Sequence, residues 1–253
     1  MLRHNKLKAR LKQDKPVLGL LNSIPSPLIV EMIGYAGYDF VILDMEHVGV
    51  NPETLENMIR SAECADLTPL VRVPSIDPAT IMRVLDCGAM GIVAPRIRNR
   101  AEAEQIVSAS RYYPLGARGI SGGRCTGFGT IDLVSYMELA NREIMVVAMI
   151  EDRNGVENIE EIVSVPGIDM ILEGAVDLSQ SYGYPARPLE PIVQKAIQHV
   201  ASKCQAYAVP FCAIPRAEGQ FEAWRKQGMN AFLMGDDRGI CFRALKAQTA
   251  MYK

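Results

Sequence analysis

The chain has 253 residues, of which 49% are hydrophobic and 22% are charged, and its formal net charge is −2. These values are typical of one globular enzyme domain, so we expect a single domain over residues 1–253. The small net charge provides no basic field for nucleic acid, and no apolar stretch is long enough to cross a bilayer, so we predict neither a nucleic-acid nor a membrane partner.

The N-terminal segment and the cysteines favour a cytoplasmic location. Residues 1–12 form a basic, helix-like segment without the apolar core of a signal peptide. The six cysteines include no Cys-x-x-Cys pair, which indicates reduced thiols and no zinc site. We therefore predict a cytoplasmic protein in which most cysteines pack in the core.

Strand and helix patterns alternate along the chain. Apolar, β-branched runs predict strands near 17–21, 39–43, 68–72, 90–94, 144–150, 168–172, 209–213 and 231–234. Amphipathic stretches predict helices after Pro52, after Asp77-Pro78, and near 100–110, 156–164, 189–207 and 217–227. About eight such repeats favour a (β/α)8 TIM barrel. A doubly wound open sheet is the alternative, because short apolar runs are ambiguous.

Residues 111–143 interrupt this alternation. Six glycines between positions 116 and 129 indicate a loop, because glycine allows backbone angles that other residues resist. A loop of this length in a compact domain is usually functional. Because it falls between the fourth and fifth predicted strands, we expect a glycine-rich lid near 111–143, at the same mouth of the barrel as the chemistry.

Four predicted strands finish on polar residues that suit catalysis. His47, Arg72, Glu151 and Asp177 each stand at or just past the end of an apolar run. In (β/α)8 barrels the functional groups lie at the C-terminal ends of the strands. Glu151 and Asp177 are hard oxygen donors suited to Mg²⁺ or Mn²⁺, although either could instead cap a helix.

The remaining groups fit an anionic substrate. His47 is a credible general base, and the planar fork of Arg72 suits a carboxylate. The backbone amides of Gly174, Ala175 and Val176 offer an anion cradle near a helix N-terminus.

Further arginines would suit a substrate with more than one carboxylate, although each could instead face solvent or a subunit interface. They are Arg96, Arg118, Arg124 and Arg238, of which we assign Arg96 and Arg124 to substrate binding.

Five motifs together resemble the HpcH/HpaI aldolase family, the pyruvate-dependent class II aldolases of the phosphoenolpyruvate/pyruvate barrel superfamily, over nearly the full length. They are Ile42-Leu43-Asp44-Met45-Glu46-His47, Val71-Arg72-Val73-Pro74-Ser75, Arg111-Tyr112-Tyr113-Pro114-Leu115-Gly116-Ala117-Arg118-Gly119, Ile150-Glu151 and Gly174-Ala175-Val176-Asp177-Leu178-Ser179.

The resemblance implies roles for the site residues and an assembly. Glu151 and Asp177 would bind a divalent metal, Mg²⁺ or Mn²⁺ with Co²⁺ as a further option, and no organic cofactor is expected. His47, held by Asp44, would handle protons, and Arg72 would bind the 2-oxo acid and its enolate. The family is typically a homo-hexamer, a trimer of dimers that exchange C-terminal helices.

The implied function is a metal-dependent carbon–carbon lyase, an aldolase that forms or cleaves 4-hydroxy-2-oxo acids through a 2-oxo acid enolate and an aldehyde. Two departures keep a second reaction open: Gly174-Ala175-Val176-Asp177 replaces the usual Gly-Pro-Ala-Asp, and Met149 stands where the family often has Gln. The alternative is a citrate synthase-type condensation of oxaloacetate with acetyl-CoA, as on the siderophore branch of this scaffold. A non-catalytic metal-binding barrel is a third alternative, which the intact set of site residues argues against.

Overall fold

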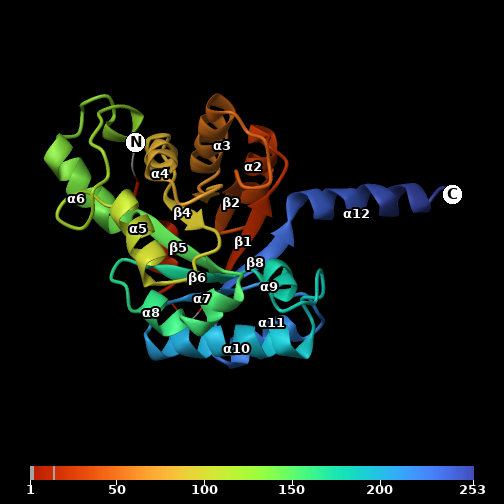
Figure 1. Ribbon diagram of the computed structural model, residues 1–253. Helices are drawn as coiled ribbons and strands as arrows, with labels where there is room; N and C mark the ends of the chain where they lie inside the picture. The colour runs from red at the N-terminus through yellow and green to blue at the C-terminus, as the bar shows by residue number, and fades with distance from the viewer. Residues whose placement is uncertain (1–2, 14) are drawn as a thin grey trace.

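Eight parallel strands form a closed barrel in the computed structural model, which describes residues 3–13 and 15–253 (Figure 1). The strands are β1 (Val17–Asn22), β2 (Phe40–Asp44), β3 (Thr68–Arg72), β4 (Gly91–Ala94), β5 (Met145–Ile150), β6 (Met170–Glu173), β7 (Phe211–Ala213) and β8 (Ala231–Asp236). The barrel closes where β8 pairs with β1, with Val17 opposite Ala231. The predicted (β/α)8 barrel is therefore confirmed, and the open sheet is excluded because an open sheet would leave these two strands unpaired.

Helices follow the strands, and all but α1, which precedes β1, and α12, which follows β8, cover the outside of the barrel. The helices are α1 (Lys6–Arg10), α2 (Pro27–Tyr35), α3 (Pro52–Cys64), α4 (Pro78–Asp86), α5 (Arg100–Ser110), the 3₁₀ turn η1 (Arg124–Thr126), α6 (Leu133–Glu143), α7 (Arg153–Glu157), α8 (Ile159–Val163), α9 (Ala175–Ser181), α10 (Pro191–Ala206), α11 (Gln220–Lys226) and α12 (Asp237–Ala250). Several begin at a side chain that accepts a hydrogen bond from a free backbone N–H, as Asn51, Asp77 and Asn99 do for α3, α4 and α5. These caps fix where each helix starts after its strand.

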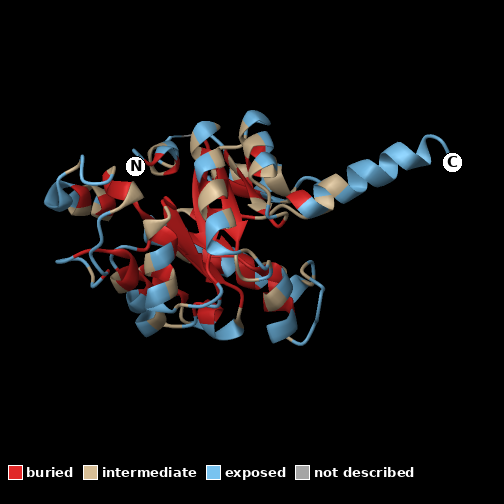
Figure 2. Ribbon diagram, turned by 90° about the horizontal axis from the view of Figure 1, so that it is seen from above, coloured by how far each residue is buried: buried red, intermediate tan, exposed pale blue. Residues whose placement is uncertain are grey.

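Two apolar clusters lie on the two sides of the barrel wall, because successive strand residues point to opposite faces. The inner cluster includes Phe40, Ile42 and Leu70, and the outer cluster lies between the strands and the helices. The ring of Phe40 needs the space beside Gly19, since a Cβ there would lie 2.1 Å from the ring Cζ. Figure 2 shows the buried strands in red at the centre of the molecule. The barrel is a packed core that supports its mouth, and it is not a pore.

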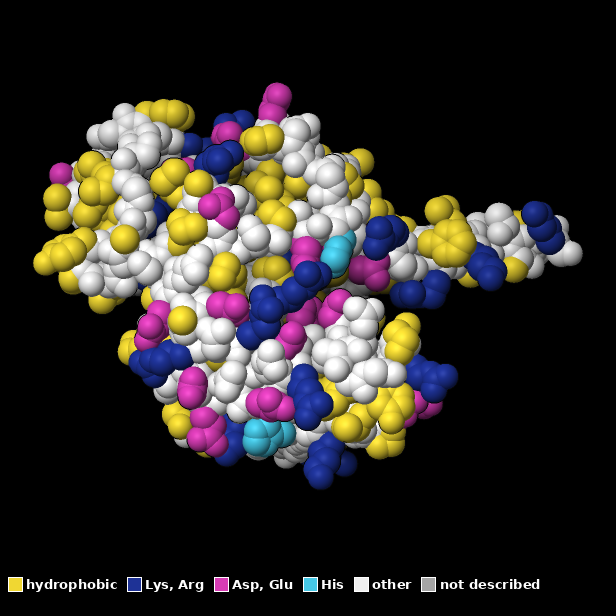
Figure 3. All heavy atoms as spheres, viewed as in Figure 1, with side chains coloured by type: hydrophobic (Ala, Val, Ile, Leu, Met, Phe, Trp, Pro, Cys, Tyr) yellow, Lys and Arg dark blue, Asp and Glu magenta, His cyan; other side chains and the backbone are white. Residues whose placement is uncertain are grey.

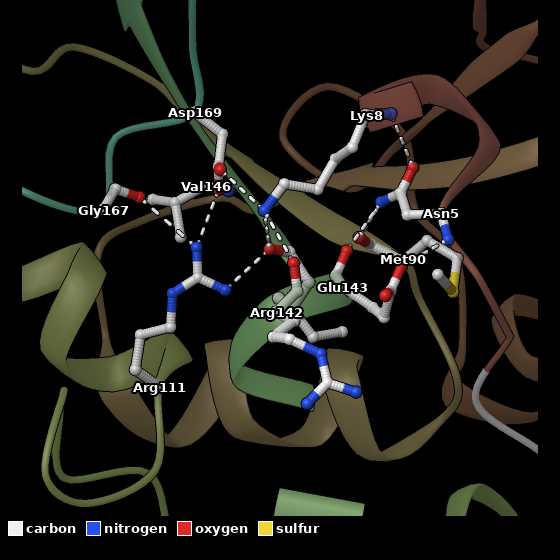
Figure 4. Close-up of polar contacts among 10 residues, drawn as sticks. Asn5, Lys8, Met90, Arg111, Arg142, Glu143, Val146, Gly167 and Asp169 are labelled. Carbon is white, nitrogen blue, oxygen red and sulfur yellow. Dashed lines mark hydrogen bonds and ion pairs between the residues drawn. The ribbon is translucent and has the colours of Figure 1, made fainter. Parts of the chain in front are cut away.

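The short helix α1 packs across the N-terminal end of the barrel, and Figure 4 shows the polar contacts that Asn5 and Lys8 make there. Nδ2 of Asn5 donates to the carbonyl oxygens of Met90 and Glu143, at 3.2 and 2.8 Å. Nζ of Lys8 lies 2.7 Å from Asp169, which also receives a 2.7 Å hydrogen bond from Arg111. From residue 3 onward, the basic N-terminal segment is therefore part of the fold of this end of the barrel, and residues 1–2 lie outside the described residues.

Residues 111–143 lie at this same N-terminal end, so the prediction of a lid at the mouth that carries the chemistry is wrong. Helix α5 carries the chain back from the C-terminal to the N-terminal end before the segment begins. Nη1 of Arg111 donates to the carbonyl of Ile144, just before β5. The second half of the segment is helix α6, and Figure 1 shows α6 on the opposite side of the barrel from α9 and α12.

Helix α12 projects away from its own barrel (Figures 1 and 2). Among its residues Asp237 is buried, and its exposed apolar side chains are Ile240, Phe242 and Leu245. The exchange of this helix between subunits stays a prediction. Within the described residues, no helix has the length and apolar character needed to span a membrane.

Candidate active site

Strand alternation brings four polar side chains to the inner side of the C-terminal mouth. In β2, β3 and β5, residues of the inner and outer apolar clusters alternate. Asp44 and Arg72 are the last residues of β2 and β3, and both point to the inner side. The same alternation, continued past the ends of β2 and β5, places Glu46 and Glu151 on the inner side as well. The sequence folds this way because each strand buries its apolar residues on both faces and ends at the mouth.

Two carboxylates hold Arg72 in a fixed orientation. Its Nε and Nη2 donate to the two carboxylate oxygens of Asp44 at 2.9 and 2.8 Å, and its Nη1 lies 3.3 Å from Oε2 of Glu46. Burial by itself would raise the pKa of Asp44, but the guanidinium of Arg72 and two backbone N–H groups outweigh it and lower that pKa. The pair stays charged, and the guanidinium keeps further N–H donors for a ligand.

Asp44 does not hold the imidazole of His47, which corrects the predicted pair. Oδ1 of Asp44 accepts hydrogen bonds from the backbone N–H groups of Glu46 and His47, at 3.0 and 3.4 Å. Nε2 of His47 instead lies 3.8 Å from Oε2 of Glu46, and its side chain is 54% exposed. Both carboxylate oxygens of Asp44 instead accept hydrogen bonds from the guanidinium of Arg72.

Glu151 is buried at the mouth, and the backbone of Arg96 holds its carboxylate. Oε1 of Glu151 accepts a 2.9 Å hydrogen bond from the backbone N–H of Arg96. Burial, together with the charges of Glu46 and Asp177, raises the pKa of Glu151 to about 7. The charges of Glu46 and Asp177 therefore act on the buried carboxyl group of Glu151, and a cation beside it would relieve this repulsion.

This donor set fits a divalent cation that brings most of its other ligands with it. In the described part of the chain, no three His, Cys, Asp or Glu side chains are arranged to surround an ion. Mg²⁺ is commonly held by one or two carboxylates, and substrate oxygens and water complete its octahedron. Glu151 and Asp177 can supply such a pair, and the buried Oε2 of Glu46 has no hydrogen-bond partner among the described residues. The residues present therefore fit Mg²⁺ or Mn²⁺.

Gly174 makes room for Glu151, but its amide is not free for an anion. A Cβ on Gly174 would lie 2.4 Å from Cβ of Glu151 and 2.6 Å from its Oε2, so a larger residue would displace the carboxylate. The N–H of Gly174 donates to the carbonyl of Ile150 at 3.0 Å, which removes it from the predicted cradle. The amides of Ala175 and Val176 stay predicted contacts.

Arg124 lies away from this mouth, so its assignment to substrate binding in its own barrel is wrong. Its guanidinium pairs with Glu63 in the last turn of α3. The side chain of Arg118 is fully buried and donates to Asp86 at the end of α4. Both arginines belong to the segment 111–143, which lies at the N-terminal end of the barrel.

Glu46 is the residue to which sequence analysis gave no role. Its Oε2 faces Arg72 and its Oε1 lies 3.4 Å from Nη2 of Arg96, so one carboxylate bridges two guanidinium groups. A signal was available, because Glu46 stands two positions after Asp44, and the strand alternation continued past β2 predicts the same side for both. Figure 3 shows acidic and basic side chains together with a histidine across the middle of one face of the molecule.

Comparisons with known proteins agree with this geometry. The sequence model of the HpcH/HpaI aldolase/citrate lyase family matches residues 19–244. The structure of citrate synthase SbnG is similar with a TM-score of 0.90 and 45% identity, over 97% of this chain and 96% of that chain. A family protein from Burkholderia cenocepacia J2315 has a TM-score of 0.92 and 29% identity, over 98% of this chain and 99% of that chain. The 5-keto-4-deoxy-D-glucarate aldolase of Shigella boydii serotype 18 is 32% identical, over 97% of this chain and 95% of its own length. The chain therefore belongs to the HpcH/HpaI aldolase/citrate lyase family and is an enzyme of the class II aldolase type.

Proposed function

We propose that this protein condenses oxaloacetate with acetyl-CoA in a citrate synthase-type reaction. The observation that carries the proposal is the 45% identity to citrate synthase SbnG over 97% of the chain. The identity to 5-keto-4-deoxy-D-glucarate aldolase is lower, at 32%. Met149 agrees with it, because its side chain packs in the inner cluster next to Gly174, where a family Gln would place an amide.

The mouth residues would bind the keto acid. Glu151 and Asp177 would hold Mg²⁺ or Mn²⁺, which when bound acts as a Lewis acid on the keto oxygen. Arg72 would donate N–H groups to the oxygen on which negative charge develops. Because Asp44 already fixes the plane of that guanidinium, little reorganisation is needed when the charge forms.

His47 would move the protons of the reaction. Its exposed ring, next to Glu46, would take a proton from the methyl carbon of acetyl-CoA, and that carbon would attack the keto carbon of oxaloacetate. Glu46 would stabilise the protonated imidazole until His47 returns this proton to the former keto oxygen, which carries the negative charge after the attack. Water would then cleave the thioester, giving citrate and free CoA thiol.

A second candidate reaction uses the same residues. His47 would take the hydroxyl proton of a 4-hydroxy-2-oxo acid, and the carbon–carbon bond would break to give an aldehyde and the enolate of a 2-oxo acid bound at Arg72. The 32% identity to 5-keto-4-deoxy-D-glucarate aldolase favours this alternative. In both reactions the substrates are small molecules, and we further propose a cytoplasmic homo-hexamer that uses α12 in its interface.

Three assays separate the reactions. Thiol release from acetyl-CoA with oxaloacetate, and its loss in Glu151→Gln, would support the condensation. Cleavage of 4-hydroxy-2-oxo acids to pyruvate, without thiol release, would support the aldolase instead. Full activity after exhaustive chelation would contradict the metal-assisted mechanism in either case.

A further inference from the structure

We propose that Arg96 and Arg98 form a second anion subsite, which binds the distal carboxylate of a dicarboxylic 2-oxo acid. This inference rests on the proposed function, because it takes the keto acid to be bound beside Arg72. It adds the two arginines that would make the site prefer this diacid to a monoacid, and it adds Arg98 as a binding residue.

A cavity of about 200 Å³ lies between the loops that follow β3 and β4. It is lined by Glu46, Ser75, Ile76, Arg96, Arg98 and Glu102. Glu46, which lines this cavity, also lies 3.3 Å from Arg72, so one side chain connects the cavity with the proposed keto acid site.

The two guanidinium groups in this cavity are partly exposed, and each makes only a long ion pair. The side chains of Arg96 and Arg98 are 57% and 49% exposed. Their ion pairs are long, 3.4 Å from Arg96 to Glu46 and 3.5 Å from Arg98 to Glu102. Arg72, in contrast, is bound by Asp44 at 2.8 and 2.9 Å and is buried. A substrate carboxylate can therefore compete for Arg96 and Arg98 without breaking a tight pair.

The spacing between the two arginine sites suits a short diacid. Arg72 and Arg96 contact opposite oxygens of the same carboxylate of Glu46, so their Nη atoms lie within about 9 Å of each other. The outer oxygens of a four-carbon diacid are roughly 5–6 Å apart, and a hydrogen bond at each end adds about 2.9 Å. Oxaloacetate can therefore reach both groups, whereas the methyl group of pyruvate offers nothing to the second.

Arg96 contributes to the site with its backbone N–H, which binds Glu151, and with its side chain, which lines the cavity. Its φ of +56° lies in the left-handed region, which is uncommon for a residue other than glycine. Such strain is often found at functional sites. In this conformation the N–H holds Glu151 while the side chain lines the cavity. A change of side chain therefore tests the subsite without removing the hydrogen bond to Glu151.

Calorimetric binding of pyruvate and of oxaloacetate, each with saturating Mg²⁺, tests the proposal independently of turnover. We expect the wild type to bind oxaloacetate more tightly than pyruvate. Arg96→Gln and Arg98→Gln should each weaken oxaloacetate binding by roughly 10- to 100-fold, the effect of losing a charge-assisted hydrogen bond, and should leave pyruvate binding nearly unchanged. Arg100→Gln is the matched control, because Arg100 pairs tightly with Glu104 on α5 at 2.7 Å and does not line the cavity.

Three results would overturn the subsite. Equal weakening of both ligands in Arg98→Gln would mean a general field effect. Wild type that binds pyruvate as tightly as oxaloacetate would refute the second anion contact and leave the proposed keto acid site intact. Wild type that binds neither acid in the presence of Mg²⁺ would refute the proposed function together with the subsite.

Discussion

Replacement of Arg72 by alanine should destabilise the protein strongly as well as stop turnover. Arg72 and Asp44 form a buried pair with two short hydrogen bonds, and Glu46 stands on the other side of the guanidinium. Removal of one partner of such a pair leaves an uncompensated buried charge and typically costs about 3–5 kcal/mol. In a chain of this size that corresponds to a fall in melting temperature of roughly 10 °C.

Arg72→Lys separates the role in stability from the role in catalysis. Lysine keeps the positive charge beside Asp44, so we expect a smaller loss of stability than in Arg72→Ala. Lysine cannot reproduce the planar, two-contact geometry, and loss of such a fixed donor typically lowers turnover by about 10²–10³. Arg72→Lys should therefore remain folded and be nearly as inactive as Arg72→Ala.

Urea unfolding and turnover, measured on the same preparations, test this reasoning. The double variant Asp44→Asn/Arg72→Ala should recover part of the stability lost in Arg72→Ala, because it removes the stranded charge. If Arg72→Ala unfolds at the wild-type urea concentration, the buried pair does not stabilise the fold as argued. If Arg72→Lys keeps most of its activity, Arg72 supplies only a general positive field.

Three further predictions concern the metal site, the assembly and the N-terminal end of the barrel. The pKa of Glu151 is about 7 in the folded protein and near its ordinary value of 4.5 in the unfolded chain, so the folded state binds the proton more tightly. The metal-free protein should therefore lose up to roughly 3 kcal/mol of stability as the pH rises from 4.5 to 7. Saturating Mg²⁺ or Glu151→Gln should flatten that slope in melting curves, and a wild type without any slope would contradict the assignment. Removal of residues 240–253, which keeps the buried Asp237, should break the oligomer in light scattering, and an unchanged mass would argue against α12 as an interface. Arg124→Ala should lower the melting temperature through loss of the Glu63 pair and leave kcat/KM near wild type, whereas a well-folded but inactive variant would show that Arg124 reaches a site after all.

Local patterns in the sequence were sufficient to predict the barrel and to identify the strand ends that carry polar residues. Apolar runs and amphipathic stretches report on neighbouring residues, so the eight strands could be located without any knowledge of their contacts. The ends of parallel strands must meet at one mouth, and this placed Arg72 and Glu151 at the same end. The same alternation also predicts that Glu46 faces the mouth together with Asp44, although sequence analysis did not use it.

Contacts between residues far apart in the chain could be known only from the folded molecule. Asp44 pairs with Arg72 across 28 positions, and Arg124 pairs with Glu63 across 61. Such pairs depend on strand register and on which end of the barrel a segment reaches, and no local pattern carries this information. The same reason explains why 111–143 was expected at the wrong end: its glycines indicate a loop, but the direction of α5 decides which end of the barrel that loop covers.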